Sequence, residues 1–272
     1  EHISEYLDSI FQPMVELLPS YIKDSTDALK MIQDTGINGI FTPKNLLTMD
    51  VTALYTNIPH NDGLQALKCH LEARSVLSPP TTTLLRLAEL VLNLNGFEFD
   101  GDFFQQRCGV AMGTKMGPSY ACLFMGHLKN RMFLAYSGPK PEFYERYIDD
   151  CLTISSVSEQ ELLSFVSFAN DFHPSISFTH ELSPSSINFL DITIKLSLGQ
   201  LETTIFYKPT DSHSYLDYHS SHSLSTRNSI PYSQFLRLRR ICSTDQDFDT
   251  DSGKMVTLFD NRAYHLELLL HA

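Results

Sequence analysis

Tyr147-Ile148-Asp149-Asp150 lies between two runs of strand-forming residues, 142–148 and 151–154. Aromatic and β-branched residues favour strands and Asp tolerates turns, so the pattern predicts a hairpin with both aspartates at its tip. Ordinary hairpin turns prefer Asn-Gly or Asp-Gly, whereas adjacent carboxylates repel each other unless solvent or a cation screens them. Two interpretations follow, a plain surface turn and a turn that presents negative charge to metal ions.

A third carboxylate, Asp50, ends a second apolar run, residues 46–51, which is typical of a short buried strand. If the strands of Asp50 and Asp149 lie side by side, their carboxylates can hold two metal ions, about 4 Å apart in such sites. Magnesium is usually bound by one or two carboxylates together with water and substrate phosphates. The pattern therefore predicts a site suited to nucleotidyl transfer.

The rest of the chain mixes helical and strand-like patterns. The predicted elements are a helix over 6–18 interrupted by Pro13, a helix over 25–32, the Asp50 strand, helices beginning near residues 59 and 81, a hairpin over 97–104, a helix over 119–133, the carboxylate hairpin, a helix capped by Ser158 and Glu161, and later strands. This order favours an α+β fold in which helices cover one face of an antiparallel sheet.

The composition is that of a globular protein, with 272 residues of which 42% are hydrophobic. Five cysteines without Cys-x-x-Cys spacing argue against a disulfide framework and a zinc site, and favour a reducing intracellular compartment. His213, His219 and His222 match no short zinc pattern. No apolar run reaches the roughly 18 residues of a membrane helix. The first residue is Glu1 and an apolar run lies close to the last, so we expect a fragment.

The net charge of −12 argues against nucleic-acid binding by the chain as a whole, because proteins that hold nucleic acid usually carry a basic patch. Residues 207–240 differ, since they hold five basic and two acidic residues with aromatic residues between them. The basic residues are Lys208, Arg227, Arg237, Arg239 and Arg240. Such a stretch either follows a nucleic-acid backbone or only faces solvent.

Three segments in order, 49–59, 109–121 and 147–150, resemble the A, B and C motifs of reverse transcriptases. Their sequences are most similar to the Penelope-like retroelement branch, which is related to telomerase reverse transcriptase. Residues 188–194, 206–211 and 229–243 extend the similarity over most of the chain. The family's usual His-Pro is replaced by His222-Ser223. The resemblance implies a right-hand polymerase palm with partial fingers and a partial thumb.

The resemblance also implies roles for the motif residues. Asp50 and Asp149 would bridge two Mg²⁺ ions, for which Mn²⁺ can substitute, and Asp150 would be a weaker ligand. Tyr55 would reject a 2′-hydroxyl and so select deoxynucleotides, and Tyr147 would pack beside the primer terminus. Without the resemblance, Tyr55 is equally well a core tyrosine.

Further substrate contacts are implied for the loop of the second motif. Gly113 and Gly117 would let the backbone approach a base pair closely, Lys115 would contact phosphate, and Gln106 would play a supporting role. By themselves these residues are also typical of a flexible loop. The thumb would bind nucleic acid through Lys208, Arg237, Arg239 and Arg240. Lys195 is a weaker candidate for the general acid that protonates pyrophosphate.

The predicted organisation is a fingers remnant over residues 1–45, a palm over 46–200, and a truncated thumb or connection region over 201–272. The implied function is RNA-directed DNA polymerisation for a retrotransposon, with an RNA template, a DNA primer and dNTPs as partners. An endonuclease domain is expected in the full-length protein, with action in the nucleus at the site of DNA synthesis and no membrane partner. The alternatives are an inactive retroelement relic that only binds nucleic acid or protein and, less favoured, a nucleotidyl cyclase.

Overall fold

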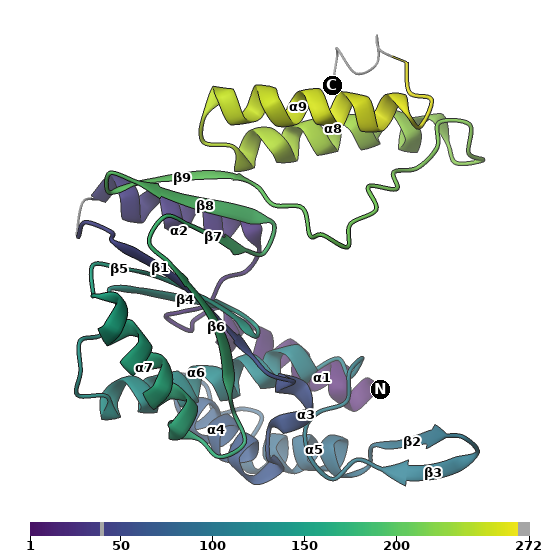
Figure 1. Cartoon of the computed structure of the whole chain (residues 1–272). Helices are drawn as coiled ribbons and strands as arrows, with labels where there is room; N and C mark the ends of the chain where they lie inside the picture. The colour runs from purple at the N-terminus through teal and green to yellow at the C-terminus, as the bar shows by residue number, and fades with distance from the viewer. Residues whose placement is uncertain (39–40, 266–272) are drawn as a thin grey trace. The chain divides into compact units, whose positions relative to one another are not determined.

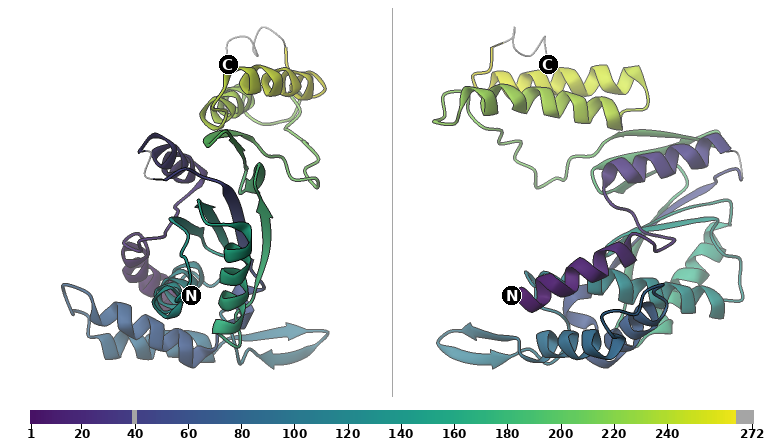
Figure 2. Two further views of the ribbon diagram at one scale, coloured as in Figure 1. Left: turned by 60° about the vertical axis from the view of Figure 1, so that its left-hand side comes forward. Right: turned by 180° about the vertical axis from the view of Figure 1, so that it is seen from behind.

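The computed structural model describes residues 1–38 and 41–265, and these residues form two compact units. The first unit combines residues 1–23 with 47–181, and the second combines residues 24–46 with the chain from residue 182 onward. Figures 1 and 2 show the elements of both units. The predicted boundaries of fingers, palm and thumb stay predictions.

A four-stranded sheet in the order β4-β5-β1-β6 forms the frame of the first unit. The strands are β1 (Asn45–Val51), β4 (Phe143–Tyr147), β5 (Asp150–Ser155) and β6 (Phe178–Ser183). β5 contains buried residues at all but its first position, as expected of a central strand. The predicted strand of Asp50 and the predicted hairpin around Tyr147 are both confirmed.

Both aspartates lie at the tip of the hairpin, as predicted, but only Asp149 is part of its loop. Asp150 pairs with Tyr147 as the first residue of β5, so the loop consists of Ile148 and Asp149. Ile148 has a φ of +51°, a left-handed conformation that β-branched residues rarely adopt. The sequence offers no Gly or Asn at this position to reveal such a turn.

Helices pack on this sheet and on one another in the first unit. The helices are α1 (His2–Val15), α3 (Leu54–Asn57), α4 (His60–Glu72), α5 (Thr81–Asn93), α6 (Gly117–Ala135) and α7 (Glu159–Phe172). α1 continues through Pro13, so the predicted interruption there is wrong. α6 is buried along most of its length, and Phe133 of α6 and Phe165 of α7 both make edge-to-face contacts with Tyr144 of β4. These rings attach the two helices to the strand that leads into Asp149.

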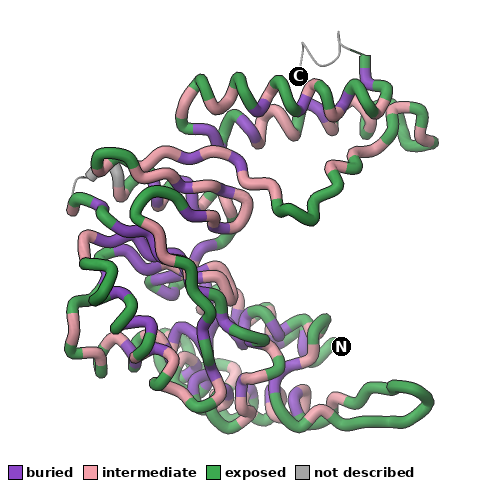
Figure 3. Tube along the Cα trace, in the orientation of Figure 1, coloured by how far each residue is buried: buried purple, intermediate pink, exposed green. Residues whose placement is uncertain are grey.

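Local sequence signals fix two further elements of this unit. Ser158 and Glu161 form the predicted capping box at the start of α7. β2 (Gly96–Phe99) and β3 (Asp102–Gln105) form the predicted hairpin, in which Asp100 and Gly101 both have positive φ angles. Figure 3 shows this hairpin as exposed along its whole length.

The second unit contains α2 (Ser25–Asn38), a three-stranded antiparallel sheet and two long helices. The sheet has the order β7-β8-β9, with β7 (Ser186–Phe189), β8 (Ile192–Ser197) and β9 (Gln200–Ile205). α8 (Leu224–Ile241) and α9 (Asp245–Asp260) lie side by side (Figures 1 and 2). Thr203 of β9 donates to the Ile241 carbonyl, and its backbone bonds to Ser243, so β9 is joined to the α8–α9 connection. Among the described residues, no helix is long and apolar enough to cross a membrane.

Asp247 gives the second unit a pH-dependent stabilising contact. Its Oδ1 accepts a hydrogen bond from Lys195 Nζ at 2.8 Å, and this bond lowers the pKa of the carboxyl group. A lowered pKa in the folded state stabilises the fold above the ordinary aspartate pKa of about 3.9, and this stabilisation disappears as the pH falls through the lowered value.

Asp247→Asn is therefore expected to reduce the free energy of unfolding at pH 7 by roughly 0.5–1 kcal/mol, and by less below about pH 4. Urea unfolding at pH 7 and pH 3.5 measures the difference. Asp249→Asn, at an exposed position of the same helix, is the matched control and should show no such pH dependence. An Asp247→Asn effect of equal size at both pH values would contradict the prediction.

Candidate active site

Asp50 and Asp149 lie on neighbouring parts of one sheet. Asp50 is the exposed residue near the end of β1, and the amide of the next residue, Val51, donates to the Asp149 carbonyl at 3.2 Å. Although the residue is exposed overall, partial desolvation of its carboxyl group raises the pKa of Asp50, and the nearby charge of Asp149 raises it further. The two carboxylates are therefore within electrostatic reach, and no ion pair or side-chain hydrogen bond joins either to another described residue.

The chemistry of this pair fits a hard divalent cation. Two carboxylates that repel each other are stabilised when a cation lies between them, and oxygen ligands are those that Mg²⁺ prefers. Within residues 1–38 and 41–265, no three His, Cys, Asp or Glu side chains are grouped so that they could hold a metal ion. The chain thus offers the Asp50–Asp149 pair, and water and a bound triphosphate would have to complete an octahedral shell.

Tyr55 lies near Asp149 and against the glycine loop, residues 109–117. It is half-buried on the short helix α3, which follows Ala53, a residue with a φ of +48°. Burial first, and then the charges of Cys122, Asp149 and Tyr147, raise the pKa of Tyr55 to about 12, so its hydroxyl stays protonated at neutral pH. Tyr55 therefore places an uncharged aromatic side chain near the two carboxylates.

Backbone hydrogen bonds hold the Tyr55 segment against the glycine loop. The amide of Val110 donates to the Tyr55 carbonyl at 2.7 Å, and the amide of Gly109 donates to the Ile58 carbonyl at 2.9 Å. Gly109 has a φ of +76°, and a Cβ atom there would lie 2.3 Å from the Tyr55 carbonyl oxygen. Only glycine permits this close approach.

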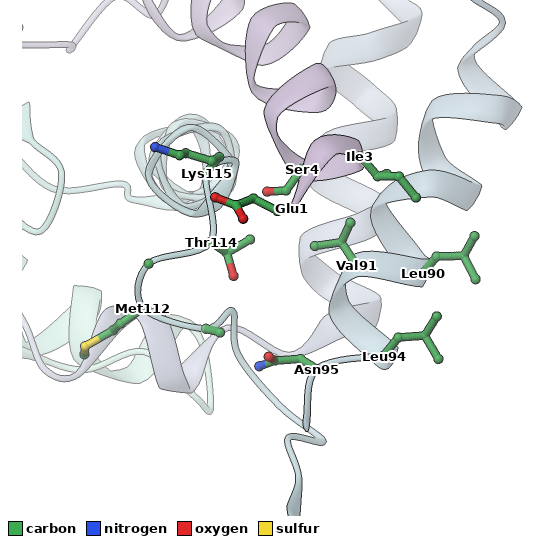
Figure 4. A pocket seen from close by; sticks show the side chains of 12 residues that line it. Glu1, Ile3, Ser4, Leu90, Val91, Leu94, Asn95, Met112, Thr114 and Lys115 are labelled. Atoms are coloured by element: carbon green, nitrogen blue, oxygen red, sulfur yellow. The ribbon is translucent and has the colours of Figure 1, made fainter. Parts of the chain in front are cut away.

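The loop of residues 111–115 separates two cavities. One cavity, of about 410 Å³, is lined by the loop together with Tyr55 and Pro118. The other, of about 520 Å³, lies between the loop, the first residues of the chain, and the apolar residues Leu90 and Val91 of α5 and Leu94, which directly follows α5 (Figure 4). Gly113, with a φ of +90°, and Lys115 line both cavities.

The predicted role of Lys115 stays a prediction. Its side chain is exposed, and none of the described residues forms an ion pair with it. Gly117 lies at the start of α6, where a Cβ atom would be in ordinary contact with the Tyr55 ring at 3.7 Å.

Helix α1 supports the end of this loop. Ser4 Oγ accepts a hydrogen bond from the Met116 amide at 2.9 Å, and Ser119 Oγ donates to Asp8 Oδ1 at 2.6 Å. Met116 and Ser119 are buried. These contacts could not be predicted from local patterns, because more than a hundred residues separate the partners.

Gln106 and Tyr147 are placed differently from each other. Gln106 accepts from the Asn95 amide group at 2.6 Å and donates to the Cys108 carbonyl at 2.8 Å, so its side chain closes the base of the β2–β3 hairpin. Tyr147 is half-buried two residues before Asp149 and lies close enough to Tyr55 to help raise the pKa of that residue. Tyr147 thus lies near the carboxylates, whereas Gln106 is engaged in local structure.

The basic residues predicted to bind nucleic acid fall into two groups in the second unit. Arg237 donates through Nη2 and Nε to Asp191 Oδ2, at 2.7 and 2.9 Å, and Arg239 pairs with Asp245 at 2.8 Å. Lys208 and Arg240 make no ion pair with any described residue, and Lys208 lines a cavity of about 320 Å³ together with Tyr207 and Arg237. Lys195 is occupied by Asp247.

Comparisons with known proteins show what this arrangement is similar to. Residues 214–271 match the Animal helix-turn-helix domain family, and no curated protein matches the chain. A telomerase from Candida albicans in complex with a fragment of telomeric RNA aligns with a TM-score of 0.71 and 11% identity, covering 96% of this chain and 46% of that one. An apo telomerase from Candida tropicalis aligns at 0.62 and 10% identity, covering 85% and 43%.

An RNA-dependent RNA polymerase of a human picobirnavirus aligns with a TM-score of 0.60 and 10% identity, covering 87% of this chain and 47% of that one. The chain thus spans less than half the length of these structures. At such low identity the likeness shows the fold alone. The predicted α+β class is confirmed, and the fold is similar to the palm of these polymerases.

Proposed function

We propose that this chain is the polymerase portion of a Penelope-like retroelement protein and acts as an RNA-directed DNA polymerase. The observation that carries this proposal is that Asp50, near the end of β1, lies close to Asp149, in the turn that leads into the neighbouring strand β5, while Tyr55 and the 111–115 loop line a cavity. The motif order and the polymerase fold support it. A nucleotidyl cyclase would have no need of a glycine loop against an aromatic ring.

In this mechanism Asp50 and Asp149 hold the metal ions, with Asp150 as a supporting carboxylate at the start of β5. Two Mg²⁺ ions, or Mn²⁺ in their place, supply Lewis-acid activation of the primer 3′-hydroxyl and neutralise the triphosphate. The residues of the chain orient the reactants. The cavity beside Tyr55 receives the deoxynucleotide, Lys115 contacts its phosphates, and Tyr147 packs against the primer terminus.

Gly113 and Gly117 allow the backbone of the loop to approach the new base pair, because neither carries a side chain. Nucleic acid is held by Lys208 and Arg240, which form no ion pairs with other described residues. Arg237 and Arg239 instead pair with Asp191 and Asp245. α9 carries five aspartates and one lysine, so contacts with phosphates come from α8 and the segment before it. We infer an RNA template, a DNA primer, an endonuclease domain elsewhere in the protein and action in the nucleus.

Primer extension with purified protein tests the proposal. A labelled DNA primer on an RNA or DNA template is incubated with dNTPs and Mg²⁺ or Mn²⁺. Template-dependent extension on RNA is expected. An absence of extension with either template and either metal ion would contradict the polymerase function and leave a binding relic as the better account.

Tyr55→Val is expected to increase the use of ribonucleotides relative to deoxynucleotides by about 10–100-fold, because the ring that blocks the 2′-hydroxyl is removed. Tyr55→Phe keeps the ring and is the matched control, which should discriminate like the wild type. The ratio of kcat/KM for dNTP and rNTP is the measurement. Equal discrimination in all three proteins would show that Tyr55 is a core tyrosine and no sugar gate.

A further inference from the structure

Arg146, directly before the carboxylate hairpin, is the largest fully buried side chain of the described residues. It lies in β4 and its exposed fraction is 0%. None of the described carboxylates forms an ion pair with it, and its Nε atom has no hydrogen-bond partner. Removing a charge from water without a counter-ion costs free energy, so hydrogen bonds to the guanidinium group must offset this cost.

The guanidinium group of Arg146 bridges two backbone carbonyls. Nη1 donates to the Ile148 carbonyl at 2.5 Å, and Nη2 donates to the Cys122 carbonyl at 3.0 Å. Ile148 belongs to the hairpin loop, and Cys122 belongs to α6, the helix that follows the glycine loop. A single side chain thus joins the turn of Asp149 to the helix that follows the glycine loop.

The turn that Arg146 holds is strained. Ile148 has a φ of +51°, which is unfavourable for a β-branched residue and persists only where the surroundings enforce it. The carbonyl of this residue is the one that accepts from Nη1. A charged donor in a dry site makes a stronger hydrogen bond than one in water, so the contact can offset the strain.

The main chain of Arg146 is fixed as well. Its amide donates to the Ser20 carbonyl at 2.8 Å, and its carbonyl accepts from the Ile22 amide at 2.9 Å. The segment that follows α1 therefore clamps β4 at the same residue that reaches into the hairpin. The main chain that carries the guanidinium group is therefore held by hydrogen bonds outside the hairpin loop.

From this geometry we infer that Arg146 is a positioning residue that sets the place of the Asp149 carboxylate relative to Asp50. The expected effect of Arg146 on kcat rests on the proposed polymerase function. The expected effect on the structure of the hairpin does not. Lysine cannot replace arginine here, because a single ammonium group cannot span two carbonyls that the planar fork reaches together.

The first test is hydrogen exchange of the hairpin. Arg146→Lys is expected to raise exchange in a peptide covering residues 143–155 by at least about tenfold, since the turn opens locally, while α4 changes little. Arg86→Lys, at an exposed position of α5, is the matched control. Unchanged exchange over residues 143–155 in Arg146→Lys would overturn the inference.

The second test is rescue. Arg146→Lys should lower kcat for single-nucleotide addition by about 100-fold with little change in the KM for dNTP, because misplacement of a reacting group by about 1 Å has effects of this size. Adding Ile148→Gly should recover about tenfold, since glycine adopts positive φ without strain. Additive losses from the two substitutions would instead indicate a merely structural role for Arg146.

A third measurement uses the native chain, in case Arg146→Lys fails to fold. Bridged Nη protons exchange slowly with solvent, and NMR of the Arg146 guanidinium group should show this protection. Fast exchange would overturn the inference. Slow exchange in a wild-type protein that extends no primer would contradict the proposed function and leave the positioning role intact.

Discussion

Asp149→Asn is expected to slow nucleotide incorporation by at least about 10³-fold, because the loss of a metal-binding charge removes several kcal/mol of transition-state stabilisation at about 1.4 kcal/mol per tenfold. The fold should be unchanged. The Asp149 side chain forms no hydrogen bond or ion pair with another described residue, and the substitution removes its repulsion of Asp50. Circular dichroism and urea unfolding test the fold, and single-nucleotide addition tests the chemistry.

Asp100→Asn is the matched control for this substitution. Asp100 also lies in a two-residue hairpin turn, has a φ of +52°, and is exposed in the β2–β3 hairpin. Asparagine tolerates the left-handed region well, so this variant should keep both stability and activity. Equal loss of activity in both variants would show that the effect comes from hairpin structure and not from the carboxylate at position 149.

Gly109→Ala is expected to destabilise the protein by about 3 kcal/mol or more, because two costs combine. A φ of +76° is unfavourable for alanine, and its Cβ would meet the Tyr55 carbonyl oxygen at 2.3 Å and the Thr56 Cα at 2.6 Å. Both neighbours are backbone atoms, so neither can move aside without breaking the hydrogen bonds between the Tyr55 segment and the glycine loop. Urea unfolding measures the loss.

Gly101→Ala separates the two costs of the Gly109 substitution. Gly101 has a φ of +84°, but a Cβ atom there would meet nothing within 4 Å. Only the backbone cost applies, and we expect a loss of about 1–2 kcal/mol. If Gly109→Ala lowers the free energy of unfolding no more than Gly101→Ala does, the close contact between Gly109 and the Tyr55 segment does not constrain the site.

The elements that depend on local chemistry could be predicted from the sequence. The Asp50 strand follows from an apolar run, the β2–β3 hairpin from its Asp-Gly turn, and α7 from its capping box. These signals act between residues close in the chain. For the same reason the adjacency of Asp50 and Asp149 required a hypothesis about strand order, which the sheet β4-β5-β1-β6 satisfies.

The features that depend on distant contacts could not be predicted. Ile148 has a left-handed conformation, which is unfavourable for a β-branched residue and so is not expected from its sequence. The buried Arg146 nearby has no sequence feature that distinguishes it from an ordinary strand residue. The pairing of Arg237 with Asp191 joins residues 46 apart and uses a cation that the sequence assigned to nucleic acid. In each case tertiary packing decides the role of the residue.

RNA-templated addition of a single dNTP by the wild-type protein and by Asp149→Asn, measured in parallel with Mg²⁺, tests the polymerase function and the role of Asp149 together. We expect addition by the wild type, a rate lower by at least about 10³-fold in the variant, and equal folding of both proteins. Addition at equal rates by the two proteins would contradict the assignment of Asp149 to the metal site. No addition by a folded wild-type protein would contradict the polymerase function itself.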